Sequence, residues 1–230
     1  GPMVEDIRTA QRLAGDLNWL ATRTRPDLSF YVSQLASAAT KQPIRAIAMG
    51  KRCLRYLAGT RDHGLSFKAC PRRSRDCGRL TGFGDASYEE GWAQTGVLVK
   101  LDGNTIGWKS TKQPQVPRST AEAECTAMAH ASHTLEGIAC LFYSMRIVID
   151  VPTLWCDNRA AGHLTAGNSE CRTKALVNRS LGVRSLIELG QLTLLFKPTL
   201  DMEADLLTKF IGAKLLTKQR KLLGCVPPRQ

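Results

Sequence analysis

The sequence predicts an α/β protein, in which a mixed five-stranded sheet is flanked by helices and preceded by a small helical segment. Apolar residues recur at three- and four-residue steps as far as Gly59, which is typical of helices. From Arg79 onward, extended and helical runs follow in the order β-β-β-α-β-α-β-α, which favours a mixed sheet covered by helices. A basic stretch without apolar periodicity lies between these regions, so a boundary is expected there.

These observations divide the chain into parts. The first three residues, Gly1-Pro2-Met3, are typical of the scar of a cleaved tag and are set aside. We expect a helical segment over residues 4–68, an exposed linker over 69–78, an α/β domain over 79–223 and a tail over 224–230.

The helical segment should contain three helices. The first ends near Thr24, Pro26 suits the first turn of the second, and Pro43 opens the third. Gly59 follows the third helix and is expected to take the left-handed conformation that glycine readily adopts there. The expected buried positions are Ile7, Leu13, Leu17 and Leu20 in the first helix, Leu28, Val32 and Leu35 in the second, and Ile44, Ile47, Leu54 and Leu57 in the third.

The α/β domain should begin with three antiparallel strands separated by glycine-bearing turns, such as the turn at Gly103. A long helix follows over 120–145, with Ser119 or Thr120 as its N-terminal cap. The expected strands are 80–86, 94–101, 105–110, 153–156 and 191–196, and the further helices begin near Asn158, cover 174–189, lie near Ala204 and cover 213–223.

The composition indicates a folded protein with a polyanionic partner. Lys and Arg total 32 against 20 acidic residues, a formal charge of +12, which favours nucleic acid over solubility alone. The eight cysteines form no C-x-x-C pair, so no zinc ribbon or thioredoxin motif is expected, and a reducing intracellular setting fits them. We find no signal peptide and no uninterrupted apolar run of about 20 residues, so we expect a soluble protein.

Four acidic residues fall where an active site would gather them. Asp85 ends the first predicted strand, Glu124 lies in the first turns of the long helix, Asp157 follows the fourth strand, and Asp205 opens the penultimate helix. Mg²⁺ prefers oxygen ligands, and two such ions about 3.5–4 Å apart supply what phosphodiester hydrolysis needs. Asp157 follows an apolar strand, where a carboxylate is hard to keep ionised without a cation or hydrogen-bond donors. The joint placement predicts a metal site.

Several segments resemble a known family. Residues 119–124, 156–158 and 204–209 resemble, in the same order, the ribonuclease H motifs of copia-type long-terminal-repeat retrotransposon polyproteins. Residues 17–21, 24–27 and 54–60 resemble the connection segment, or thumb-like region, that joins reverse transcriptase to ribonuclease H in that family. The polymerase motif Tyr-x-Asp-Asp is absent from this sequence.

The resemblance implies a ribonuclease H-like fold and a metal-dependent endonuclease that hydrolyses the RNA strand of RNA–DNA hybrids during reverse transcription. It implies that Asp85, Glu124, Asp157 and Asp205 are catalytic and bind two Mg²⁺ ions, which Mn²⁺ can replace, and that the products carry a 5′-phosphate and a 3′-hydroxyl. It also implies a partnership with the reverse transcriptase part of the same polyprotein, and a location in cytoplasmic virus-like particles and in the nucleus.

The glutamate role has two candidates, Glu124 and Glu122. Glu124 is preferred because Glu124-Cys125-Thr126-Ala127 matches the family's Glu-x-x-Ala spacing, and Glu122 is the runner-up. Two residues two positions apart on a helix cannot face the same way, so only one should point at the metals.

Further residues are candidates for substrate contacts. Ser87 and Asn158 lie beside predicted ligands and could reach the 2′-hydroxyls that distinguish RNA from DNA. The basic residues Arg72, Arg73, Lys218 and Arg220 could contact phosphates, although a solvated surface explains each of them equally well.

The sequence also departs from the family. Ala175 stands where relatives often carry His, and Cys125 where they carry an aromatic residue. The loop over 197–204 contains no His, which many cellular ribonucleases H use there, so we expect modest activity.

Two other functions stay open. One is a module that binds hybrid or duplex without cutting it, which the four carboxylates disfavour. The other is a DNA nuclease of the same general fold, such as an integrase or a junction resolvase, which the resemblance of the upstream segments disfavours.

Overall fold

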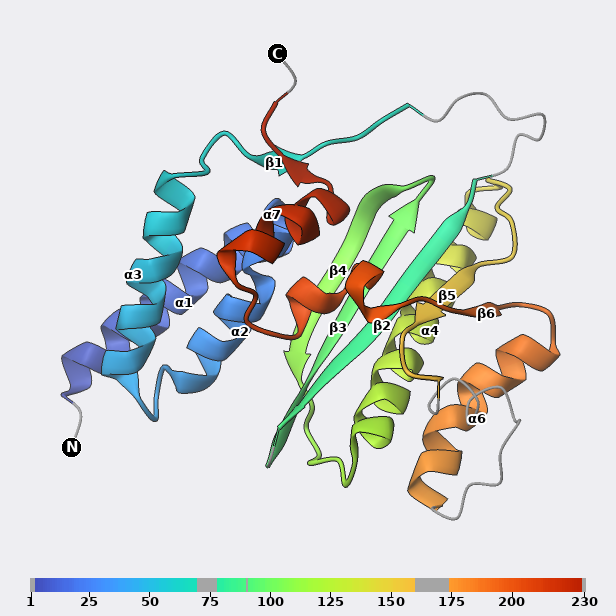
Figure 1. Ribbon diagram of the computed structural model, residues 1–230, viewed down its shortest axis with the longest axis horizontal. Coiled ribbons are helices and arrows are strands. Elements are labelled where there is room, and N and C mark those ends of the chain that lie inside the picture. The colour runs from blue at the N-terminus through green and yellow to red at the C-terminus, as the bar shows by residue number, and fades with distance from the viewer. Residues whose placement is uncertain (1–2, 70–77, 90, 160–173, 229–230) are drawn as a thin grey trace.

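The computed structural model describes residues 3–69, 78–89, 91–159 and 174–228, without the side chains of 174–179. A group of helices lies beside a twisted sheet that carries helices on both faces (Figure 1). The expected helix from Asn158 and the basic residues Arg72 and Arg73 fall largely or wholly outside the described residues.

The mixed five-stranded sheet is confirmed, with strand order β4-β3-β2-β5-β6. Within this sheet, β3 pairs antiparallel with both β2 and β4, whereas β2 pairs with β5 and β5 with β6 in parallel. Every predicted strand is present. Their bounds are β2 Leu80–Glu89, β3 Trp92–Leu101, β4 Asn104–Lys112, β5 Thr153–Cys156 and β6 Thr193–Phe196.

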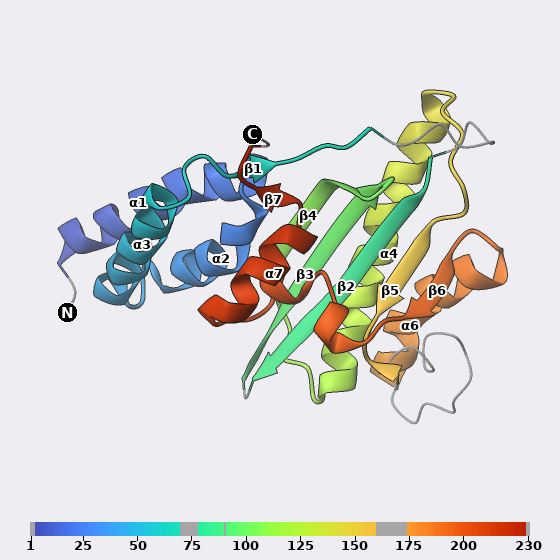
Figure 2. The same cartoon turned by 45° about the horizontal axis from the view of Figure 1, so that its top comes forward.

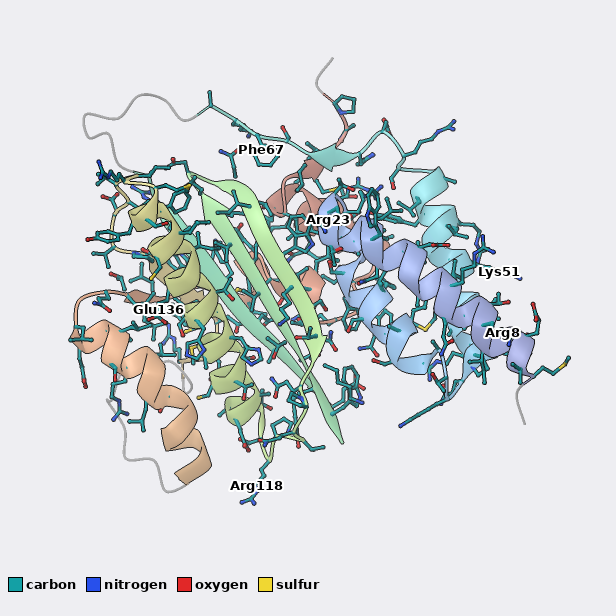
Figure 3. All side chains as sticks on the ribbon, turned by 180° about the vertical axis from the view of Figure 1, so that it is seen from behind. Arg8, Arg23, Lys51, Phe67, Arg118 and Glu136 are labelled. Carbon is teal, nitrogen blue, oxygen red and sulfur yellow. The ribbon has the colours of Figure 1, made fainter. Side chains whose placement is uncertain are left out.

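Two helices, α4 (Thr120–Ser144) and α6 (Lys174–Glu188), cover one face of the sheet, as the view from behind shows (Figure 3). Ser119 caps α4, because its Oγ accepts a hydrogen bond from the Glu122 amide at 3.2 Å. The core on this side is apolar and includes Leu80, Val97, Met128, Leu135 and Leu154.

The opposite face is covered by the C-terminal part of the chain (Figure 1). This part comprises the short 3₁₀ helices η2 (Thr199–Asp201) and η3 (Asp205–Leu207) and the helix α7 (Ala213–Leu222). Phe83 and Leu98 of the sheet pack against Leu206 and Leu223 there. The helix expected near Ala204 is present only as the single 3₁₀ turn η3.

The N-terminal segment forms the expected three helical units: α1 (Val4–Arg23), η1 (Pro26–Leu28) continued by α2 (Ser29–Ala38), and α3 (Pro43–Ala58). Two details of α3 differ from expectation. Ile44 is 71% exposed and Leu54 48%, and Gly59 has a right-handed φ of −83°. The buried face of α3 consists instead of the small residues Pro43, Ala46, Gly50 and Cys53. At Gly50 there is no room for a side chain, because a Cβ there would lie 2.0 Å from Leu13 Cδ2 of α1. Close packing of α3 on α1 selects that face.

A two-stranded ribbon was not predicted. It pairs β1 (Gly64–Leu65) with β7 (Cys225–Val226), so the chain end returns to the helical segment (Figure 2). Two-residue strands carry no periodicity that a sequence pattern could reveal.

The helical segment docks on the outer edge of the sheet. Trp108 of β4 donates its indole N–H to the Ala21 carbonyl at 2.6 Å, and Gln94 of β3 donates to Ser33 Oγ at 2.9 Å. Phe210 packs edge-on against Phe30 at 4.8 Å between ring centroids. Covering an edge strand in this way removes a surface on which other chains could pair.

Within the described ranges, we find no helix with both the length and the apolar character needed to cross a membrane.

Candidate active site

Three of the predicted carboxylates meet at one place. Asp85 of β2, Asp157 directly after β5 and Asp205 at the start of η3 each offer one oxygen, and these oxygens lie within 4.8 Å of one another. The sheet explains the first two positions, because Phe83 pairs with Trp155 in the parallel register and each aspartate follows two residues later. Residues two apart along a strand face the same way, so both carboxylates reach the same face.

Asp205 reaches this place because η3 lies almost on the sheet backbone. Gly96 of β3, which pairs with Asp85, has no side chain in the way, and a Cβ there would lie 2.6 Å from Thr208 Cγ2. The Thr208 hydroxyl donates to Asp85 Oδ2, and Ser87 Oγ donates to the Thr208 carbonyl at 2.7 Å. The segment after Asp205 is therefore held on β2 by two hydrogen bonds of Thr208, one to Asp85 and one to Ser87.

Glu124 lies next to the three aspartates, on the first turns of α4. Its carboxylate accepts a hydrogen bond from the Ala86 amide, and its charge interacts with those of Asp85 and Asp157. Glycine in β2 permits this approach, because a Cβ on Gly84 would lie 3.2 Å from the Ala127 carbonyl oxygen of α4. The structure places Glu124 beside the cluster but outside the group of three within 4.8 Å.

Glu122 points elsewhere. Its Oε2 accepts a hydrogen bond from the Arg118 amide at 2.7 Å, which is a capping contact at the start of α4. Figure 3 shows Arg118 beside the N-terminal end of α4. The geometry therefore favours Glu124 over Glu122 as the residue near the aspartates.

The buried carboxylates hold their protons unusually tightly. Burial raises the pKa of Asp85 to about 7, an effect that Lys209 opposes and Asp205 reinforces. Burial, together with the charges of Asp85 and Asp157, raises the pKa of Glu124 to about 10. Burial also raises the pKa of Asp205. A raised pKa means that the ionised carboxylate has too few positive charges or hydrogen-bond donors around it to offset its burial.

The cluster fits a divalent cation. Glu124 Oε2 is buried without a hydrogen-bond partner among the described residues, and Asp205 Oδ1 is contacted by the Lys209 ammonium at 2.7 Å. Carboxylate oxygens are the ligands that Mg²⁺ and Mn²⁺ prefer, and a bound cation would satisfy these oxygens and lower the raised pKa values.

The predicted substrate contacts are dispersed. Ser87 uses its hydroxyl on Thr208, and Asn158 is half-buried beside Asp157. Lys218 forms an exposed ion pair with Asp201 at 3.0 Å. Arg220 donates to the Tyr56 hydroxyl at 3.3 Å, where α7 meets the helical segment. Arg220 therefore joins two parts of the fold, and a role for any of the four in substrate binding stays a prediction.

Three residues at this site were not predicted: Gly96, Thr208 and Lys209. A glycine inside a predicted strand is a signal of close backbone approach, so Gly96 was detectable in principle. Thr208 and Lys209 lie in the recognised segment 204–209, but nothing in their residue types indicates contact with Asp85 or Asp205.

The described residues thus form a mixed five-stranded sheet on which three aspartates converge. A scan against models of known families finds no match. The chain is a homologue of a segment of retrotransposon Pol polyproteins, because it is 32% identical over 239 residues to the Pol polyprotein from transposon RE2 of Arabidopsis thaliana. That match covers 99% of this chain and 16% of the relative, so the chain spans about a sixth of that polyprotein.

Other relatives are more distant or shorter. The Transposon Ty1-NL2 Gag-Pol polyprotein of Saccharomyces cerevisiae is 25% identical over 91% of this chain and 12% of its own length. Secreted RxLR effector protein 161 of Plasmopara viticola is 34% identical over 51% of this chain and 82% of its own length. Among solved structures, the LC11-RNase H1 in complex with RNA/DNA hybrid is 17% identical, with a TM-score of 0.47 over 56% of this chain and 94% of that one.

Proposed function

We propose that this chain is the ribonuclease H of a copia-type retrotransposon Pol polyprotein and hydrolyses the RNA strand of RNA–DNA hybrids. The observation that carries the proposal is the convergence of Asp85, Asp157 and Asp205 within 4.8 Å, in a chain homologous to Pol polyproteins over 99% of its length. The charge of +12 supports a nucleic-acid substrate.

Asp85, Asp157, Asp205 and Glu124 would hold the divalent cations. A divalent cation held there, Mg²⁺ or Mn²⁺, would activate water for attack on the RNA phosphate and would offset charge on the leaving oxygen, so that cleavage would leave a 5′-phosphate and a 3′-hydroxyl. Thr208 orients Asp85, the Ala86 amide orients Glu124, and Ser87 holds Thr208 in place. These contacts keep the ligand oxygens in position before any substrate arrives.

We further propose that the reverse transcriptase part of the same polyprotein is the partner of this chain. A location in cytoplasmic virus-like particles, with entry into the nucleus, belongs to the same proposal. The homology to Pol polyproteins supports both.

The first test is cleavage of a labelled RNA–DNA hybrid with Mg²⁺ and, separately, with Mn²⁺. The wild type should cut the RNA strand, and Asp157→Asn should reduce the rate at least about 100-fold, because loss of even an outer-shell partner costs 10–100-fold. Asp16→Asn, an exposed carboxylate on α1, is the control and should cut normally. Tight binding without cutting by the wild type would favour the binding module, and cutting of DNA duplex would favour the DNA nuclease.

The second test separates the two glutamates. Glu124→Gln should lower the cleavage rate strongly, whereas Glu122→Gln should leave the rate largely intact, because its carboxylate contacts the Arg118 amide. Equal losses from both substitutions would overturn the assignment of Glu124.

A further inference from the structure

One cation of the chain itself reaches into the carboxylate cluster. Lys209 Nζ lies 2.7 Å from Asp205 Oδ1, four residues back along the chain. Its position is set by its neighbour Thr208, whose hydroxyl donates to Asp85. The ammonium charge acts on Asp85, Glu124 and Asp205, in each case opposing the rise in pKa. Lys209 thus partly neutralises the site that a metal would neutralise.

The Lys209 ammonium is partly exposed to solvent. The side chain of Lys209 is 41% exposed, and its ammonium contacts Asp205 Oδ1 as an ion pair between residues four positions apart. Lys100 provides a contrast within the same fold. It is buried, and its ammonium donates both to Glu203 Oε2 and to the Leu222 carbonyl at 2.6 Å. Lys100 is fixed in place, whereas Lys209 has a flexible stem and a route to solvent.

We propose that Lys209 is a built-in counter-ion, which occupies the carboxylate site in the metal-free protein and is displaced when a divalent cation binds. The inference rests on the proposed metal site. The Lys209 ammonium and a divalent cation among the same carboxylates would repel each other, because both are positive and both lie close to Asp205. Lys209 therefore stabilises the metal-free fold and lowers the apparent affinity for the cation.

Thermodynamic linkage gives the first test. Lys209→Met keeps the apolar stem and removes the charge, so Mn²⁺ should bind roughly 5-fold or more tightly in calorimetric titration, the low end of ordinary coupling between two ligands. Without metal the variant should melt about 2–4 °C below the wild type, and saturating Mn²⁺ should abolish or reverse that difference. Lys51→Met is the control, because Lys51 lies on α3 at the far side of the helical segment (Figure 3) and should change neither quantity.

Displacement itself is measured on the wild type. Acylation of lysines by a water-soluble ester, followed by mass spectrometry of peptides, should modify Lys209 faster when Mg²⁺ is added, while Lys51 keeps its rate. A purely structural lysine would be equally protected with and without Mg²⁺. Lys209→Arg retains the charge and should bind Mn²⁺ nearly as weakly as the wild type.

The outcomes separate this inference from the proposed function. If the wild type shows no Mn²⁺ isotherm and no Mn²⁺-dependent melting shift, the metal site itself is overturned. If the wild type binds Mn²⁺ and Lys209→Met binds it with unchanged or weaker affinity, only the counter-ion role is overturned. The same holds if the melting deficit of Lys209→Met is equal with and without Mn²⁺.

Discussion

Two aspartates of this chain, Asp27 and Asp85, are equally buried, at 2% exposure each, but their surroundings are opposite. Asp27 lies where the helical segment meets the chain end. Arg25 donates to both of its oxygens, at 3.0 and 2.8 Å, and the Tyr56 hydroxyl donates at 2.6 Å. Arg25 also donates to the Thr60 carbonyl at 3.0 Å. The charges of Asp27 and Arg25 are thus paired with each other and hydrogen-bonded within the chain.

Asp85 receives a hydrogen bond from the Thr208 hydroxyl but lies among other carboxylates. Burying a charge is costly unless it is paired, so the first arrangement stabilises the fold and the second leaves a deficit of positive charge. Lys209 reduces that deficit only in part. A buried carboxylate such as Asp27, which is paired with a cation of the chain, stabilises the fold. A buried carboxylate such as Asp85, which lies among other carboxylates, is suited to binding a cation.

The largest effect is expected at Asp27. Asp27→Asn leaves the Arg25 guanidinium buried without its counter-charge, which should lower the free energy of unfolding by about 3–5 kcal/mol in urea denaturation. Asp201→Asn breaks an exposed ion pair and should cost less than about 1 kcal/mol. Similar values for the two variants would contradict the structural role of the buried Asp27–Arg25 pair.

At Asp85 the expected loss is in activity. Asp85→Asn removes a proposed metal ligand and should slow hybrid cleavage more than about 100-fold. The metal-free variant should be at least as stable as the wild type, because the substitution removes repulsion with Asp205. Cleavage rates and melting temperatures of the same preparations check both parts, and a variant that is strongly destabilised without metal would place Asp85 in the structural class of Asp27.

A smaller effect should come from Gly96, which brings η3 onto the sheet. In Gly96→Ala the new Cβ meets Leu207 Cβ at 2.9 Å, so η3 must shift. Overpacking of this kind costs about 1–3 kcal/mol, and the displaced Asp205 should lower the cleavage rate roughly 10-fold. Gly107→Ala in β4 meets Val99 Cβ at an ordinary 3.8 Å and is the matched control. Unchanged cleavage by Gly96→Ala would show that the approach of η3 is not critical.

The smallest effect is the dependence of stability on pH. The pKa of Asp85 is raised to about 7 in the fold, above its ordinary value of 3.8. The folded state therefore binds more protons than the unfolded state between these values, and the metal-free protein should lose stability as pH rises. Between about pH 6 and pH 8 Asp85 contributes a loss on the order of 1 kcal/mol, or about 2–4 °C in melting temperature, and Glu124, whose pKa is raised to about 10, adds to it.

Asp85→Asn should reduce this dependence to the part that Glu124 contributes, and Mn²⁺ should suppress it in the wild type, since a cation favours the ionised carboxylates. A wild type that becomes more stable as pH rises over this interval would contradict the raised pKa of Asp85.

Much of the fold was predictable because local patterns and the final contacts agree. The long helix 120–145 and the strand 153–156 have strong periodicity or clear bounds, and the structure places them at Thr120–Ser144 and Thr153–Cys156. The buried face of α3 was predicted wrongly at Ile44 and Leu54, because the packing of α1 against Gly50 decides it and no local pattern records that contact. The ribbon of β1 and β7 joins residues about 160 positions apart and was equally invisible.

Residue types and their spacing predicted the fold class, the carboxylates at strand and helix ends, and the resemblance to retrotransposon polyproteins. These features depend on residue type and spacing, which are local. The folded chain was needed to show that Glu124 rather than Glu122 lies near the aspartates and that Thr208 and Lys209 enter the site. It was also needed to show that the charge of Asp27 is paired within the chain, whereas Asp85 lies among other carboxylates. The reason is physical: burial and electrostatic compensation are sums over neighbours that lie far apart in the chain, and only folding brings those neighbours together.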